Sequence, residues 1–94
     1  MASEIMSEFI ADLFSQISGL EQSISNGETD IIARQIHTIK GASGNVGAKR
    51  LEKLAREAEK AGIAADMDQA SAFVSDLIQQ ADLLKMELKN SGFL

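Results

Sequence analysis

The segment HTIKGASGNVG, residues 37–47, combines a histidine and a lysine with three glycines. His37 is the only histidine of the chain, and a neutral imidazole near physiological pH can act as a nucleophile. Lys40 follows one helical turn later, where its ammonium could neutralise a phosphoryl oxygen. Gly41 and Gly44 leave backbone without side chains nearby, although each glycine costs a helix interior about 1 kcal/mol relative to alanine. This combination indicates an imidazole that is presented to another macromolecule.

The apolar residues around His37 predict the direction in which it points. They step by four and three along one helix face: Ile32, Ile36, Ile39, Ser43 and Val46. At about 100° per residue, His37 lies roughly 140° from this stripe, outside the core sector. We therefore expect His37 to be exposed. The alternative is an ordinary surface histidine, with glycines that serve close helix packing.

Three further stripes with helical spacing divide the rest of the chain. They comprise Met6, Ile10, Leu13, Ile17, Leu20 and Ile24; then Leu51, Leu54, Ala55, Ala58 and Gly62; then Ala70, Val74, Leu77, Ala81, Leu84 and Leu88. Asn26-Gly27 and Gly47 are predicted breaks, with caps at Thr29 or Asp30 and at Asp66 or Asp68. Short connections favour antiparallel neighbours. The expected fold is all-α: a single domain of residues 1–94 that forms an antiparallel up-down-up-down four-helix bundle.

Composition excludes several classes of function. No apolar run reaches the ~18 residues of a membrane span, and a net charge of −5 argues against nucleic acid as a partner. One histidine and no cysteine cannot build a typical transition-metal site, so we expect no metal on this chain. The charge is uneven: residues 34–60 carry seven bases against three acids, whereas residues 1–33 carry six acids and no base. A solvated surface with uneven charge is the simplest interpretation.

The segment from His37 to Gly47 resembles the motif of histidine-containing phosphotransfer (HPt) domains, His-x-hydrophobic-Lys-Gly-small-small-x-x-hydrophobic-Gly. The segments GETDIIARQ before it and RLEKLAREAEKAG after it are also similar to such domains. The resemblance implies a four-helix bundle that carries a phosphoryl group in a multistep two-component phosphorelay. The group would come from an aspartyl phosphate on one response-regulator receiver domain and pass, reversibly, to a second.

The resemblance also implies roles for individual residues. His37 would be the phosphorylated residue, Lys40 would steady the phosphoryl oxygens, and Gly41 would give clearance to the docking receiver. Glu59, 22 positions after the histidine, matches a family position that often hydrogen-bonds the far ring nitrogen. It would then orient the imidazole and favour its neutral Nε2 as the nucleophile. The alternative for Glu59 is a solvated acid that pairs with Arg56 or Lys60.

The positive middle third would favour encounter with the acidic active site of a receiver. Gly41, Gly44, Arg34 and Arg56 are the predicted partner-binding residues. The resemblance implies no cofactor on this chain and Mg²⁺ on the partner receiver. It further implies a cytoplasmic phosphocarrier without autokinase activity, a monomer whose partners are receiver domains, including that of a hybrid sensor kinase.

Other interpretations remain open at the level of sequence. The phosphoacceptor domain of a chemotaxis-type histidine kinase shares the bundle, but a kinase domain phosphorylates it. A non-catalytic helical adaptor would bind response regulators without being labelled. The dimerising helix of ordinary sensor kinases fits less well, because Thr38 follows His37 in place of an acidic residue and the chain has no proline. Both a free-standing protein and a piece of a longer hybrid kinase are compatible with the sequence.

Overall fold

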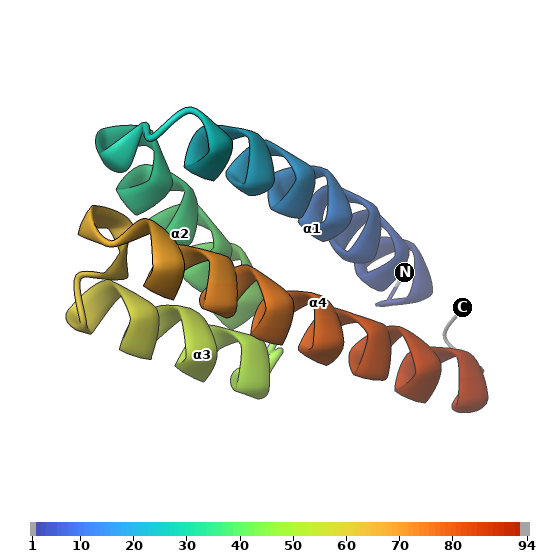
Figure 1. Ribbon diagram of the computed structural model, residues 1–94. Coiled ribbons are helices and arrows are strands. Elements are labelled where there is room, and N and C mark those ends of the chain that lie inside the picture. The colour runs from blue at the N-terminus through green and yellow to red at the C-terminus, as the bar shows by residue number, and fades with distance from the viewer. Residues whose placement is uncertain (1, 93–94) are drawn as a thin grey trace.

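The computed structural model describes residues 2–92, which form four helices and one short 3₁₀ turn, with no strand among them. The elements are α1 (Ala2–Ser25), α2 (Thr29–Asn45), α3 (Lys49–Lys60), η1 (Ile63–Ala65) and α4 (Met67–Asn90). Each helix runs antiparallel to the one before it, and α1 and α4 extend together past the shorter α2 and α3 (Figure 1). The predicted up-down-up-down four-helix bundle is therefore confirmed.

The buried residues follow the predicted stripes. On α2 the buried side chains are Ile32, Ile36, Ile39 and Ser43. They face the long helices and α3, which contribute most of the remaining core: Phe9, Ile10, Leu13, Ile17, Leu20, Leu51, Ala55, Ala58, Phe73, Val74, Leu77 and Ala81. Each fully buried leucine or isoleucine contributes about 1.5–3 kcal/mol relative to an exposed one. This burial fixes the rotation of α2 about its axis, so the opposite face of α2 must lie outside.

The turn between α2 and α3 depends on Gly47. Its φ of +75° lies in the left-handed region that favours glycine. The amide of Gly47 donates to the carbonyl of Gly44 at 3.2 Å, and that of Ala48 donates to the carbonyl of Ser43 at 2.9 Å. These bonds satisfy carbonyls at the end of α2 and reverse the chain. The reversal lays α3 directly against α2, so that side chains of the two helices can contact each other.

Two details of the predicted helix ends are wrong. Gly62 was expected on the buried stripe of the third helix, but α3 ends at Lys60 and Gly62 has a φ of +64°. Since Gly62 leads into the unpredicted turn η1, it terminates a helix and does not pack one. Neither Thr29 nor Asp30 caps α2, because Thr29 is already helical and Glu28 holds the cap position without a side-chain hydrogen bond.

The cap predicted for the last helix is confirmed at Asp66. Its carboxylate accepts hydrogen bonds from the amides of Asp68 at 3.0 Å and Gln69 at 3.2 Å. Such a cap satisfies backbone donors that the helix itself leaves unpaired. It fixes the start of α4 and so the level at which α4 packs on the other helices.

Candidate functional site

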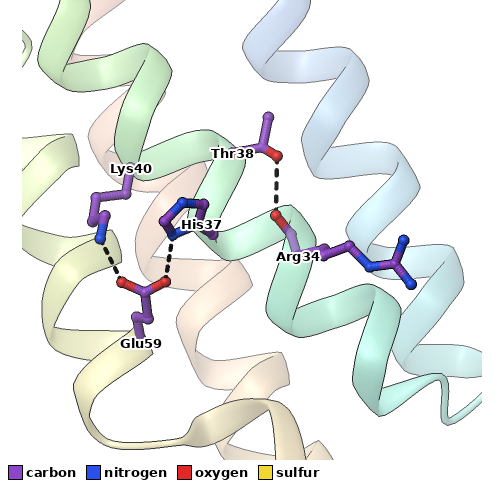
Figure 2. A network of polar contacts seen from close by, with 5 residues as sticks. All are labelled: Arg34, His37, Thr38, Lys40 and Glu59. Atoms are coloured by element: carbon purple, nitrogen blue, oxygen red, sulfur yellow. Dashed lines mark hydrogen bonds and ion pairs between the residues drawn. The ribbon is translucent and has the colours of Figure 1, made fainter.

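His37 projects from the outer face of α2, as its spacing from the core stripe predicts. Its side chain is 69% exposed. Figure 2 shows the ring turned toward α3, with Lys40 on the same side of the helix. The imidazole is therefore open to solvent and anchored at one edge only.

The anchor is Glu59 on α3. Its Oε2 lies 2.7 Å from Nδ1 of His37 (Figure 2). An ionised carboxylate can only accept, so Nδ1 donates its proton and Nε2 of the neutral ring keeps the free lone pair. The expected contact across 22 residues is present. The alternative, in which Glu59 pairs with Arg56 or Lys60, is wrong.

Lys40 holds the other oxygen of the same carboxylate. Its ammonium donates to Oε1 of Glu59 at 2.6 Å, and both side chains are partly buried. The pKa of Glu59 is held below its ordinary value, first by the hydrogen bond from Lys40 and then by the one from His37. The sequence predicts that the Lys40 ammonium lies beside the ring and neutralises a phosphoryl oxygen. In the structure it binds the carboxylate that orients the ring.

Gly41 provides the bare surface that the sequence predicts. A Cβ built at this position would meet nothing within 4 Å. The residue is exposed and lies one turn after His37 on the outer face of α2. Another molecule can therefore approach the backbone beside the imidazole.

Gly44 differs from Gly41, because the space beside it is occupied. A Cβ at Gly44 would lie 2.5 Å from Oε2 of Glu52 on α3. The other oxygen of Glu52 lies 3.0 Å from Nη2 of Arg56. Gly44 thus does not extend the bare surface, and Arg56 is already paired within α3. Sequence reasoning missed Glu52, although its spacing of four residues from Arg56 is the usual signal of a helical ion pair.

Arg34 lies on the opposite side of α2. Its guanidinium extends toward α1 (Figure 2), and it makes no hydrogen bond or ion pair with any residue from 2 to 92. Its backbone carbonyl accepts from the hydroxyl of Thr38 at 3.0 Å. Of the two predicted partner-binding arginines, Arg34 alone carries an unpaired charge.

Two observations concern other kinds of site. Nowhere within residues 2–92 do three or more metal-binding side chains of the His, Cys, Asp or Glu type gather. In the same part of the chain, no helix has the length and apolar character needed to cross a membrane.

Comparison with known proteins adds one finding. The family model described as Hpt domain matches residues 4–90 of the 94-residue chain. This range includes every residue of the site. Neither the curated proteins nor the solved structures gave a match.

Proposed function

Because this chain belongs to the Hpt domain family, whose members carry phosphoryl groups in two-component signalling, we propose that His37 is its phosphoacceptor. His37 takes the group from an aspartyl phosphate on one response-regulator receiver and passes it, reversibly, to the aspartate of another. The observation that carries this proposal is the anchoring of Nδ1 by Glu59 on a ring that is 69% exposed. Nε2 is then the nitrogen available to attack.

In the transfer step Nε2 forms a bond to phosphorus as the bond from phosphorus to the aspartyl oxygen breaks. The aspartate leaves as a carboxylate, and Nδ1 keeps its proton, so the ring becomes a phosphorylated cation. Glu59 stabilises that cation through the 2.7 Å contact. Phosphoryl transfer depends mainly on positioning and charge neutralisation. In the reverse step the carboxylate of the second receiver attacks phosphorus, and the ring returns to neutrality.

Lys40 supports this chemistry in two ways. Its hydrogen bond to Glu59 keeps the carboxylate ionised and aimed at Nδ1. It also places a cation one turn from the ring, where it neutralises the charge of the phosphoryl oxygens. Mg²⁺ belongs to the receiver in this proposal, and the chain itself acts as a cytoplasmic, monomeric carrier without autokinase activity.

A labelling experiment tests the proposal. The protein is mixed with ³²P-phosphorylated receiver domains of its source organism, including those of hybrid sensor kinases, in the presence of Mg²⁺. We expect an acid-labile label that His37→Gln abolishes and that Lys53→Gln, an exposed control on α3, leaves unchanged. ATP and Mg²⁺ alone should give no label. A label that survives His37→Gln refutes the assignment of the phosphoacceptor.

The same experiment separates the two alternatives. Labelling by a histidine kinase domain with ATP, and by no receiver, would identify a phosphoacceptor of the chemotaxis type. Binding of a receiver without any label would identify an adaptor.

A further inference from the structure

A groove of about 280 Å³ lies between the start of α3 and the second half of α4. Its apolar floor consists of Leu51, which is buried, and of Ala48 and Leu84, which are partly buried. Leu83 lies at its edge and is 42% exposed, and Met86, one turn later on α4, is 61% exposed. Exposed apolar side chains beside an apolar groove are typical of a surface that another molecule covers.

The groove lies apart from the imidazole of His37. Arg50 lines it, whereas Glu59, which holds the ring, lies nine residues later on α3. Nine residues correspond to about 180° around a helix and roughly 13 Å along it. α3 therefore presents Glu59 to α2 on one side and borders the groove on the other. A molecule in the groove leaves the imidazole open.

The charges of α3 near the groove are mainly positive. Arg50 pairs across the groove with Glu87 of α4 at 3.3 Å, and both side chains are more than half exposed. Lys53 approaches Glu57 of the same helix only to 4.0 Å. Lys49 lines the groove at the positive end of the α3 dipole and forms no ion pair among residues 2–92. Three bases thus accompany two acids, and one of the bases is unpaired.

The remaining charges of α4 in this region lie away from the groove. Asp82 and Lys89 lie about 100° and 120° from Leu83 around the helix, on the side opposite to α3. Asp76 is on the groove face of α4, but it precedes Gln80, the first residue of α4 that lines the groove, by a full turn. The unpaired charge that an occupant meets in the groove is therefore that of Lys49.

A second copy of this chain does not suit the groove. Each chain has a net charge of −5, so two copies repel each other. In a symmetric dimer the same surface of both subunits meets itself. Such a dimer would set Lys49 of one copy against Lys49 of the other. The complementary occupant is a different protein that brings carboxylates to this surface.

We propose that the groove between α3 and α4 binds an amphipathic helix of a partner protein, one that carries carboxylates beside its apolar face. An apolar side chain of the partner enters between Leu83 and Ala48, and a carboxylate pairs with Lys49. Helices commonly bind apolar grooves through anchors spaced by three and four residues. This partner is distinct from a receiver at His37, because the two lie on opposite sides of α3. It holds the carrier while His37 stays accessible.

NMR spectroscopy of the ¹⁵N-labelled chain tests the inference with two synthetic helical peptides. Both peptides carry leucines spaced by three and four residues. The flanking positions are glutamates in the acidic peptide and lysines in the basic one. We expect the acidic peptide to shift the amide signals of Ala48, Leu51 and Leu84 and to leave that of His37 unchanged. It should bind at least about tenfold more tightly than the basic peptide.

Three variants locate the contact. Leu83→Glu should weaken binding of the acidic peptide by at least about fivefold, because it places a like charge at the apolar edge. Lys49→Glu should weaken it by a similar factor, because it reverses the unpaired charge. The matched control Lys89→Glu changes the net charge equally on another face of α4, and it should alter the affinity by less than about twofold. All three residues are exposed, and thermal unfolding checks that each variant is folded.

Several outcomes would overturn the inference. These are no binding of the acidic peptide, equal affinities for the two peptides, or equal losses in Lys49→Glu and Lys89→Glu. A dimer in sedimentation velocity that Leu83→Glu abolishes would show that a second copy covers the groove. Labelling of His37 by a receiver should keep its rate in saturating acidic peptide, and a blocked reaction would contradict the separation of the two surfaces. A protein that no receiver labels even without peptide contradicts the proposed function alone.

Discussion

The two sides of α2 are built differently around the same imidazole. On the side of α3, Lys40, Glu59, Arg56 and Glu52 satisfy one another, and Glu52 fills the space beside Gly44. On the side of α1, Arg34 is unpaired beside an open groove. The first side holds the ring in one orientation by contacts within the protein. The second side has an unpaired charge and an exposed surface that can contact another molecule.

This difference shows that charge near a reactive residue need not serve binding. Arg34 and Arg56 both belong to the positive middle third of the sequence, yet of the two only Arg34 has no ion pair among residues 2–92. An exposed ion pair contributes little to stability, about 0–1 kcal/mol. It nevertheless places a carboxylate beside the guanidinium, which offsets the positive charge that a partner would meet.

Among changes to the side of α2 that faces α3, replacement of Glu59 should lower the rate of phosphoryl transfer most. In Glu59→Ala the ring loses the one hydrogen bond that it makes within residues 2–92, so transfer should fall by roughly tenfold to a hundredfold, as when a carboxylate that orients a metal-bound imidazole is removed. The loss should appear with a receiver and with phosphoramidate alike, because the defect lies in the ring. Glu59→Gln keeps an acceptor for Nδ1 and should recover part of the rate. Rates measured by quench-flow would contradict the orienting role if Glu59→Ala matched the unaltered protein.

Substitutions at the two glycines should separate the open surface from the filled one. Gly41→Gln places a side chain where nothing lies within 4 Å. It should slow transfer from a receiver by at least about tenfold through misplaced docking. Stability should rise by up to about 1 kcal/mol, because a glycine leaves the helix.

Gly44→Ala is the matched comparison. Its Cβ would meet Glu52 at 2.5 Å, so the flexible end of Glu52 must move away and release Arg56. Transfer should change by less than about twofold, and the gain in helix propensity should be offset by the lost contact. Urea unfolding and transfer rates measure both variants. Equal effects on transfer at the two positions would remove the distinction between them.

The smallest effect concerns the titration of Glu59. Its pKa is lowered chiefly by Lys40, so the contact stabilises the folded protein above the ordinary pKa of 4.5 and is lost as pH falls through the lowered value. Lys40→Met should move the pKa of Glu59 back toward its ordinary value. NMR titration of the side-chain carboxyl carbon measures this shift. Lys53→Met, which removes a distant exposed lysine, should leave it unchanged, and an unshifted Glu59 in Lys40→Met would show that Lys40 does not hold it.

Much of the fold and the outward direction of His37 could be predicted, because burial repeats with the period of the helix. Ile32, Ile36 and Ile39 are buried as their spacing requires, and the same spacing excludes His37 from the core. Gly62 was misplaced because a glycine on an apolar stripe fits close packing and chain reversal equally well. Only its φ of +64° distinguishes the two.

The site itself was predictable in part. Only the likeness to a known motif linked Glu59 to His37. Its further bond to Lys40, the filling of Gly44 by Glu52 and the pairing of Arg56 were not predicted. The first two depend on the level at which α3 packs on α2, which no local pattern reports, whereas the pair of Arg56 with Glu52 lies within α3 at a spacing of four residues.

The sequence by itself determined four helices and an imidazole that stands outside their core, since both follow from the alternation of apolar and polar residues along one chain. Only the tertiary structure decided which carboxylate meets the ring and which glycine lies open. Those outcomes depend on side chains far apart in sequence that come within a few ångströms when two helices pack at one particular level.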